Sequence, residues 1–545
     1  MSRSEVHATT DAVVIIGAGA AAVSAAWPLV EAGREVLMLA PQPAGSTTPR
    51  EGESFSARRR QDPGQWKDFL GEDFVGIGRN AAETPKMKVP GLRFIQDGFT
   101  ARVGLTAHNI TPTGSLVAGG LTQMWGAGAF CYTDEDLAGT ALQASDLSAS
   151  YERVAARIGV SGVEDDAIAP YLGLGLPLQA PIPLHPNFEH VLSRAAKRPP
   201  KAPGFALGRT RNAVLTEDRT DRLACNLSNL CLWGCPRQSI YSAAHDLDAL
   251  KRRSNFTLRD DVYVESLEAM AGEGNAPLYR IRSLELRTES SHPDIVAGTI
   301  MLAAGTLAST RLALQLTGRR GVPQPLFTHP AYAMVGLNLS RVGARSAESG
   351  FALGHLAYRV QLSEDDSVAA FGVMFPSEGL LMSDLAANMP FSMRGSVALT
   401  RALAPALVVM NGYVRGEHGW CTLKLGEDGR TELAGGYRES FEPTYRAVTS
   451  RLRKEMRRLG VWPLPGGTRR AELGSDSHYA GGLAMTADPD PRRLTTTPEG
   501  ELRDAPGVFA VDGAALPRLG LKHPTFTIMA NADRISSALQ NSGRI

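Results

Sequence analysis

Two histidines near the carboxy-terminal end, His478 and His523, have side chains suited to acid–base chemistry. His478 lies in a loop of small residues, GSDSHYAGGLAM, and His523 stands directly before Pro524 and an apolar-striped helix pattern. A neutral imidazole accepts a proton near pH 7, so either residue can remove a proton from a weakly acidic group. Taken singly, a loop histidine is more often an ordinary surface or hydrogen-bonding residue. The surrounding elements therefore have to decide between these two interpretations.

A glycine-rich turn near the start of the chain is the second feature with chemical meaning. Gly17, Gly19 and Ala22 form G-x-G-x-x-A. The expected order is a buried strand from Val13 to Ile16, the turn, an alanine-rich helix to about Ala32 that Gly33 ends, and a second strand from Val36 to Leu39. In such a β-α-β unit the turn lets a pyrophosphate approach the backbone, and the helix amino terminus faces the phosphates. The stretch therefore predicts a dinucleotide-binding fold.

One position departs from that nucleotide-binding pattern. The acidic residue that binds a ribose commonly ends the second strand, and this place holds Ala40, followed by Pro41 and Gln42. Gln42 is a neutral side chain that can hydrogen-bond a ribose hydroxyl instead. The missing acid argues against free NAD as the ligand.

Length and composition narrow the class of protein. A chain of 545 residues is too long for one simple core, and about two to four folding units are expected. The 57 basic and 56 acidic residues leave a net charge of +1, which gives no sign of a nucleic acid or polyanionic partner. The apolar run from Ala12 to Leu29 is interrupted by glycines and Pro28, so no membrane span is expected. Its flank is not clearly basic, as a signal peptide requires, and a cytoplasmic protein is expected.

Five cysteines are present, and three of them, Cys225, Cys231 and Cys235, form a C-x5-C-x3-C cluster. Reduced, buried thiols are the expectation, with a disulfide or a metal or iron–sulfur site as the alternatives. The spacing fits no common metal pattern, and a fourth nearby ligand is missing. We therefore expect no metal site, and the role of this cluster stays open.

The middle of the chain predicts a mixture of excursions and regular elements. Residues 43–110 and 163–200 are rich in turn residues and are expected to run over the surface, and the glycine-rich residues 111–130 are expected to lie against something flat. The expected elements are a helix from Ala144 to Ile158 with Ser145 as its cap, strand–turn–strand over Asn255 to Ala269, a strand from Thr299 to Ala303, and a helix from Leu307 to Leu314.

Residues 320 to about 440 change in character. Apolar and polar residues alternate in segments such as ALGHLAYRVQL and WCTLKL, which is typical of an antiparallel sheet. A helix with Pro443 in its first turn follows, from Glu442 to Leu459. The expected fold class is α/β: a Rossmann-like domain with an inserted domain built on an antiparallel sheet with helices. The expected division is 1–319, 320–465, and a return to the first domain over 466–545.

Five motifs in this order resemble the glucose–methanol–choline (GMC) oxidoreductase family of FAD-dependent alcohol oxidases and dehydrogenases. They are IIGAGAAAVSAA, AGGLTQMWGAG, MLAAGTLASTRLAL, HYAGGLAM and VDGAALPRLGLKHPTFTIMANADRIS. The resemblance extends over nearly the whole chain, although residues 320–440 match only in their placement as the substrate domain. The stretch CLWGCP is similar, more weakly, to variants near sugar-oxidising members.

The resemblance implies a set of contacts with FAD. Gly17, Gly19 and Ala22 would face the pyrophosphate, Gly119 and Gly120 would run beside the flavin, the Val264 backbone would contact the adenine, Asp512, Gly513 and Ala514 would hold the central region, and Pro524 and Thr525 would contact the isoalloxazine edge. His478 matches the catalytic histidine of the family, and His523 the place that is Asn or His in different members.

The implied reaction is oxidation of an alcohol to a carbonyl by hydride transfer to flavin N5. His478 would be the general base, and His523 would hydrogen-bond the developing alkoxide. The substrate would be a small-molecule alcohol, and the CLWGCP and GGLTQMWG stretches favour a sugar or glycosylated metabolite. Oxygen or another carrier would accept the electrons.

Met124 occupies the place where some relatives attach FAD through a histidine. Methionine cannot form that bond, so non-covalent FAD is expected. Two other functions stay open. One is a redox-neutral lyase on the same scaffold with structural FAD, and the other is a non-catalytic homologue that has lost FAD, which the missing acid at Ala40 motivates.

Overall fold

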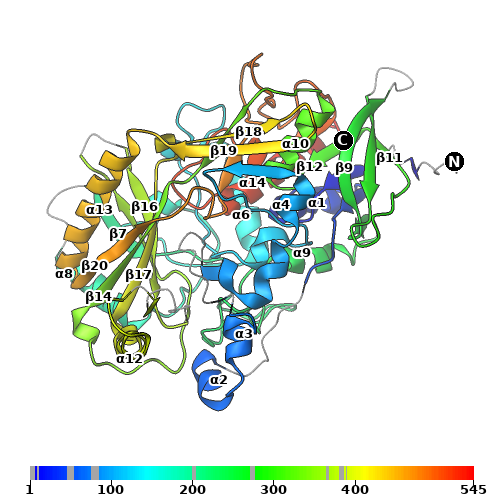
Figure 1. Cartoon of the computed structure of the whole chain (residues 1–545). Helices are drawn as coiled ribbons and strands as arrows, with labels where there is room; N and C mark the ends of the chain where they lie inside the picture. The colour runs from blue at the N-terminus through cyan, green and yellow to red at the C-terminus, as the bar shows by residue number, and fades with distance from the viewer. Residues whose placement is uncertain are drawn as a thin grey trace.

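The fold is described from a computed structural model of the chain. It describes residues 7–8, 12–45, 54–74, 76, 85–198, 204–270, 277–363, 367–379, 386–387 and 389–545. Figure 1 shows an antiparallel sheet with α13 and α8 at one end of the molecule, and α1 and α14 with the strand β12 toward the other. The long strands β18 and β19 run along the top of this view between the two ends.

A five-stranded parallel sheet forms the core of the first half, with strand order β22-β12-β2-β3-β8. Its strands are β2 (Val13–Ile16), β3 (Val36–Leu39), β8 (Phe256–Arg259), β12 (Thr299–Leu302) and β22 (Val508–Ala510). Leu302 pairs with both Ile16 and Ala510. Because these strands are parallel and in register, the segments that follow Ile16, Leu302 and Ala510 meet at one edge of the sheet. Three motifs far apart in sequence therefore come together there.

Helices cover this sheet, as the apolar character of its strands requires. The longer ones are α1 (Ala20–Glu31), α6 (Ala144–Ile158), α9 (Ala243–Leu250), α10 (Thr306–Leu316) and α14 (Thr525–Asn541). α14 packs against both α1 and α6. The predicted span of α6 is confirmed, but its predicted cap is wrong. Gln143 caps the helix instead of Ser145, because its backbone N–H donates to the Asp146 carboxylate at 2.8 Å.

A six-stranded antiparallel sheet, in the order β20-β14-β17-β16-β15-β7, forms the second half. Its strands are β7 (Phe205–Arg209), β14 (Ala331–Asn338), β15 (Leu356–Val360), β16 (Ala370–Pro376), β17 (Leu407–Val414) and β20 (Val461–Arg470). Val408 and Met410 on β17 join the core under α13 (Phe441–Arg458), whereas Val409 and Asn411 face a cavity. This alternation follows from the period of two of a strand. The antiparallel sheet expected from the alternating sequence is confirmed.

Two further sheets flank these. One has the order β21-β13-β18-β19-β4 and joins β4 (Leu105–His108), β13 (Gln324–Thr328), β18 (Gly419–Leu425), β19 (Thr431–Tyr437) and β21 (Tyr479–Gly481). The other has the order β1-β11-β10-β9 and joins β1 (His7–Ala8), β9 (Tyr263–Met270), β10 (Leu278–Leu284) and β11 (Ile295–Ala297). A pair of two-residue strands completes the set: β5 (Val160–Ser161) and β6 (Leu178–Gln179).

The segment 163–200 is more regular than its prolines predict. Helix α8 (Pro186–Lys197) forms there, with Pro186 in its first turn, where a missing backbone N–H costs nothing. Phe188 and Val191 of α8 are buried in the core of the six-stranded sheet. Strand β7 also belongs to this sheet, although it precedes residue 320 in the sequence. α8 and β7 are therefore parts of the second half in addition to the predicted segment, and the boundaries at 320 and 465 stay a prediction.

The remaining elements are short. The helices are α2 (Phe55–Gln61), α3 (Trp66–Leu70), α4 (Phe99–Val103), α5 (Asp134–Leu137), α7 (Ala169–Leu172) and α12 (Met393–Leu403), and the 3-10 helices are η2 (Pro85–Lys88), η3 (Pro90–Ile95), η4 (Gly120–Gln123), η5 (Leu339–Arg341), η6 (Ala404–Ala406), η7 (Gly416–His418) and η8 (Gly513–Ala515). α2, α3, α4, η2 and η3 lie within the excursion predicted for residues 43–110. Residues 46–53 and 77–84 of the predicted excursion lie outside the described residues.

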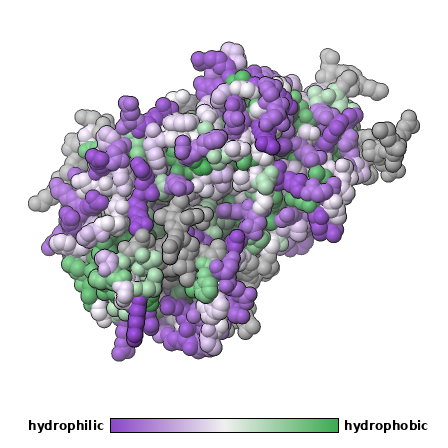
Figure 2. Space-filling model, viewed as in Figure 1, coloured by the Kyte–Doolittle hydropathy of each residue, from purple (hydrophilic) through white to green (hydrophobic). Residues whose placement is uncertain are grey.

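The surface in Figure 2 is largely hydrophilic, with hydrophobic residues gathered at the lower left. Exposed apolar side chains in the second half include Leu339, Val342, Phe391, Met393 and Val397, which lie in or beside η5 and α12. Within the described part of the chain, no helix has both the length and the apolar character needed to cross a bilayer.

Candidate active site

A mostly apolar cavity of about 470 Å³ has walls from both halves of the molecule. The predicted site residues that line it are Gly17, Gly19, Gly120, Met124, Val264, His478, Asp512, Gly513, His523, Pro524 and Thr525. These residues come from the edge of the parallel sheet and from both carboxy-terminal motifs. Ala333, Val409 and Asn411 of the six-stranded sheet form part of the facing wall. The cavity therefore connects the glycine-rich turn with the two histidines.

Four predicted site residues lie behind this lining rather than in it. Ala22 is fully buried in α1. The carbonyl of Gln42 accepts the Ala118 N–H at 2.8 Å, and Gly119 donates its N–H to the Ala18 carbonyl at 2.8 Å. The Ala514 N–H donates to Asp512 at 2.9 Å. Pro41 lines the cavity near the expected ribose position, and a ribose contact by Gln42 stays a prediction.

The glycine-rich turn has the geometry that its sequence predicts. Gly17 has a φ of +112°, and a Cβ there would collide with the carbonyl oxygen of Ala303, so only glycine fits. At Gly19 a Cβ would meet only Gly120 Cα, at 3.9 Å, so the space beside it is open. The amino terminus of α1 has no side-chain cap. Its first N–H groups are thus available to an anion in the cavity.

Asp512 joins a second glycine turn to the same edge of the sheet. Its carboxylate accepts hydrogen bonds from Gly305 N–H at 2.8 Å, Ser309 Oγ at 2.6 Å and Ala514 N–H at 2.9 Å. Burial raises the pKa of Asp512 to about 6, although these donors act in the opposite direction. The carboxylate fixes the start of α10 and the segment after β22 against each other, where both line the cavity.

The rings of His478 and His523 lie next to each other in the wall of the cavity. Their ring centroids are 5.2 Å apart, with 43° between the ring planes. His523 stands directly before Pro524, the N-cap of α14, and its Nε2 is buried with no hydrogen-bond partner among the described residues. Burial, followed by the nearby charge of His478, holds the pKa of His523 well below its ordinary value. His523 is therefore a neutral ring with one unused polar atom.

Three residues that sequence reasoning missed surround His478. Asp476 Oδ2 lies 3.0 Å from His478 Nδ1, and His329 Nδ1 lies 3.1 Å from the same nitrogen. The Tyr413 ring packs against His329, His478 and His523, with centroids 4.7, 5.2 and 5.4 Å away. A carboxylate two positions before a histidine was a visible signal for Asp476. The sequence around His329 and Tyr413 offered no such signal.

These side chains are also the candidate metal ligands of the described chain. The ligand atoms of His329, Asp476 and His478 all lie within 4.8 Å of one another. The Nδ1 atoms of His329 and His478 lie within hydrogen-bond distance of each other, so the two rings can share a proton.

A buried lysine also lines the cavity. Lys86 is 9% exposed, and its Nζ donates to the Trp125 carbonyl oxygen. Burial lowers the pKa of Lys86 to about 8, although Cys231 and Cys235 oppose this shift. Nothing in the local sequence, ETPKMKVP, distinguishes this lysine from a surface residue.

All five cysteines are free thiols, so the alternative of a disulfide within the cluster is wrong. Burial raises the pKa of Cys225 to about 11 and that of Cys131 and Cys421 to about 12. Cys231 is also shifted upward by burial and accepts the Ala352 N–H through its sulfur at 3.4 Å. Thiols shifted in this direction are poor nucleophiles near neutral pH.

The fold joins a parallel sheet that carries a glycine-rich turn to an antiparallel sheet, with the cavity between them, and the comparisons give proteins that this arrangement resembles. Residues 443–532 match the sequence model of the GMC oxidoreductase family, over a segment that contains both predicted catalytic histidines. The whole fold is similar to the crystal structure of pyridoxine 4-oxidase from Mesorbium loti, with a TM-score of 0.60 and 14% identity over 98% of this chain and 99% of that one. No curated protein sequence matches the chain. The predicted resemblance to the GMC family and the predicted fold class are confirmed.

Proposed function

We propose that this protein is an FAD-dependent oxidoreductase that oxidises an alcohol to a carbonyl compound, with His478 as the general base. The observation that carries the proposal is the pairing of His478 with His523 in the wall of the cavity that also contains the glycine-rich turn. The carboxy-terminal match to the GMC oxidoreductases supports the same class of reaction.

The residues present fit FAD. The open space beside Gly19 and the uncapped start of α1 suit a pyrophosphate, and both lie in the cavity wall. Val264 lines the same cavity, where an adenine contact is expected, and Pro524 and Thr525 line it beside His523. Met124 has no group able to form a covalent bond to the cofactor, so we propose that FAD is bound non-covalently.

FAD supplies an isoalloxazine ring that accepts a hydride. The protein's part is to bind the alcohol and to take its hydroxyl proton, because an alcohol gives up hydride readily only as that proton leaves. His478 accepts the proton at the ring nitrogen that is free of its neighbours. Asp476, 3.0 Å from the other ring nitrogen, stabilises the resulting imidazolium. The unpartnered Nε2 of the neutral His523 hydrogen-bonds the substrate oxygen and holds the carbinol in place.

The substrate is a small-molecule alcohol. The mostly apolar walls with a few polar groups at one place suit a substrate that is positioned at its reacting hydroxyl. A sugar or glycosylated metabolite stays a prediction from the sequence, as do oxygen or another carrier as the electron acceptor and a cytoplasmic location. The fold neighbour is named as an oxidase of pyridoxine, which makes pyridoxine the other alcohol to test first.

Anaerobic bleaching of the flavin tests the proposal. The purified yellow protein is mixed without oxygen with pyridoxine, simple sugars, benzylic alcohols and short aliphatic alcohols, and the flavin absorbance is followed. We expect at least one class to bleach the flavin. A protein that binds FAD but is bleached by none of them, while dithionite reduces it, would favour a redox-neutral function. A purified protein that neither contains nor takes up FAD would favour the non-catalytic alternative.

A further inference from the structure

We infer that His329 is a positioning residue that fixes the protonation of His478, so that the Nε2 atom of His478 is the base. The inference rests on the proposed function for its catalytic meaning and extends it to a residue outside the five sequence motifs quoted above. It is carried by a chain of contacts that joins the Gly520 carbonyl, His329, and His478.

Strand pairing places the two rings together. β13 and β21 are antiparallel, and Thr328 pairs with Tyr479. One step further along this register, His329 stands opposite His478. Opposite residues of an antiparallel pair have side chains close enough to interact. Ser477, with a φ of +63°, turns the chain so that Asp476 and His478 both approach His329.

The hydrogen bonds then determine where the protons lie. His329 Nε2 contacts the Gly520 carbonyl oxygen, and only an N–H can donate to a carbonyl. His329 is fully buried, and burial lowers its pKa, with contacts to Asp476 opposing this only in part. A neutral His329 has one ring proton, so its Nδ1 is bare and accepts. His478 Nδ1, 3.1 Å away, must be the donor.

A neutral His478 that carries its proton on Nδ1 has its lone pair on Nε2. Because Nδ1 is occupied by His329 and Asp476, Nε2 is the nitrogen left for a ligand in the cavity that His478 lines. When Nε2 takes a proton, Nδ1 keeps its own and the ring becomes a cation. Burial alone would raise the pKa of Asp476, but the charge of His478 and the contacts with His329 hold it below its ordinary range. The carboxylate is thus charged beside that cation.

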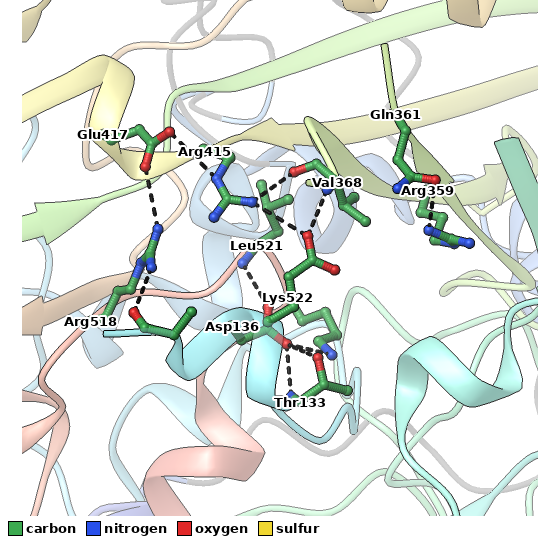
Figure 3. A network of polar contacts seen from close by, with 12 residues as sticks. Thr133, Asp136, Arg359, Gln361, Val368, Arg415, Glu417, Arg518, Leu521 and Lys522 are labelled. Carbon is green, nitrogen blue, oxygen red and sulfur yellow. Dashed lines mark hydrogen bonds and ion pairs between the residues drawn. The ribbon is translucent and has the colours of Figure 1, made fainter. Parts of the chain in front are cut away.

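The segment that carries Gly520 is anchored firmly enough to set the position of His329. Lys522 Nζ lies 2.6 Å from Asp136 Oδ2 and donates to the Tyr171 carbonyl at 2.6 Å, with both ionic side chains buried. The Leu521 N–H donates to Asp136 Oδ1 at 3.3 Å. Figure 3 shows Lys522 and the Leu521 backbone directed at Asp136. A Cβ at Gly520 would stand 2.7 Å from Asp136 Oδ1, so the backbone lies directly on this carboxylate.

The remaining titratable groups around the two rings are Tyr413 on β17 and His523 before α14. Burial raises the pKa of Tyr413 and keeps the phenol neutral. His523 is neutral for the same physical reason. Of the groups that face His478, Asp476 therefore carries the charge. Its Oδ2 atom and His329 Nδ1, 3.0 and 3.1 Å from His478 Nδ1, are the two acceptors beside the Nδ1 proton.

The test compares three variants by anaerobic stopped-flow reduction with an alcohol that bleaches the wild type. His329→Leu removes both hydrogen bonds. His329→Asn restores an acceptor near the Nδ1 position, because its amide oxygen is attached to Cγ as Nδ1 is in histidine. The control is His355→Leu, since His355 is equally buried and also hydrogen-bonds a backbone carbonyl, that of Phe351, at 2.8 Å.

We expect His329→Leu to lower the limiting reduction rate by about tenfold or more, with little change in the substrate concentration at half-saturation. The pH at half-maximal rate should fall, because the charged form of His478 loses an acceptor. His329→Asn should recover most of the rate, and His355→Leu should keep the wild-type rate and midpoint. Equal behaviour of His329→Leu and His355→Leu would overturn the inference.

A measurement without substrate separates this inference from the proposed function. Long-range ¹H–¹⁵N spectra of histidine-labelled protein, assigned with His478→Gln, report which ring nitrogen carries the proton. We expect the Nδ1–H form of His478 in the wild type and in His355→Leu, and a mixture in His329→Leu. An Nε2–H form in the wild type would refute the role of His329, whatever alcohol the protein oxidises. Absence of bleaching by every alcohol, with the expected spectra, would count against the proposed function alone.

Discussion

The imidazole rings of His478 and His523 lie with their centroids 5.2 Å apart, although the two residues are 45 positions apart in the chain. His478 stands directly before β21, which pairs with β13, and His523 stands before Pro524 and α14, so two different elements bring the rings together. Both rings line a cavity that reaches the glycine turn after β2. This relationship gives the proposed reaction its two polar contacts with substrate.

Replacing the proposed base separates chemistry from cofactor binding. We expect His478→Ala to slow flavin reduction by about 10²- to 10⁴-fold, the usual effect of removing a general base. FAD should stay bound, because the phosphate-facing turn is untouched. His523→Asn is the matched comparison, and its effect should be smaller, because an amide keeps a hydrogen-bonding group at that place. Stopped-flow reduction and the flavin-to-protein absorbance ratio measure both quantities. Reduction of His478→Ala at a near-normal rate would remove this residue from the mechanism.

Alanine substitutions at two glycines of the same turn are expected to have different effects, one on FAD affinity and the other on the stability of the fold. At Gly19 the backbone φ is −92° and a Cβ meets only Gly120 Cα at 3.9 Å, so Gly19→Ala should fold normally. Its methyl group would fill space expected for the pyrophosphate, and FAD affinity should fall at least about tenfold, or 1.4 kcal/mol. Gly17→Ala should destabilise the fold itself by at least about 1–3 kcal/mol, because φ is +112° and Ala303 blocks the Cβ.

Quenching of FAD fluorescence by apoprotein gives the affinity, and thermal unfolding gives the stability. Gly33→Ala serves as a control for backbone strain without collision, since φ there is +81° and the space is empty. Normal FAD affinity of a folded Gly19→Ala variant would argue against a pyrophosphate at this turn.

Because Lys86 is buried, we expect a neutral residue in its place to stabilise the fold by an amount that depends on pH. Its pKa is lowered from 10.5 in the unfolded chain to about 8 in the folded one, so the unfolded chain binds this proton more tightly. The cost to folding is fully present below about pH 8 and disappears as the pH rises toward 10.5. We therefore expect Lys86→Met to raise the free energy of unfolding at pH 7 by at most about 3 kcal/mol, and by less at pH 10.

Urea unfolding followed by circular dichroism at both pH values measures this difference. Lys67→Met, at a lysine whose side chain is 55% exposed, should change stability little at either pH. A loss of stability in Lys86→Met at pH 7 would mean that the ammonium serves a bound group that offsets its burial.

Denaturation tests how the cofactor is held. Because Met124, which lines the cavity, has no group that can bond covalently to FAD, the flavin of the proposed enzyme should separate from the unfolded chain. Precipitation with acid, followed by absorbance of the supernatant and the pellet, distinguishes the outcomes. Yellow colour that stays with the washed pellet would show a covalent bond and contradict this prediction.

The local pattern of the chain determined much of the fold. The unit from β2 to β3, the helix α6 and the transition from β12 to α10 lie where the sequence predicts them, because each is set by hydrophobic periodicity and by a glycine that ends or begins it. Prolines concealed α8, since a proline in the first turn of a helix looks the same in sequence as one that prevents it. The two carboxy-terminal histidines were found through short motifs that lie within one stretch of chain.

The tertiary structure alone decided what surrounds those histidines. His329 lies 149 residues before His478, and only the pairing of β13 with β21 brings them into contact. Lys86 reaches the cavity wall from a short turn whose sequence resembles a surface segment. Such contacts depend on strand register and burial across distant parts of the chain, and these are properties that no local periodicity contains. The sequence determined which elements form and which motifs they carry, and the packing of the two halves decided which side chains share the site.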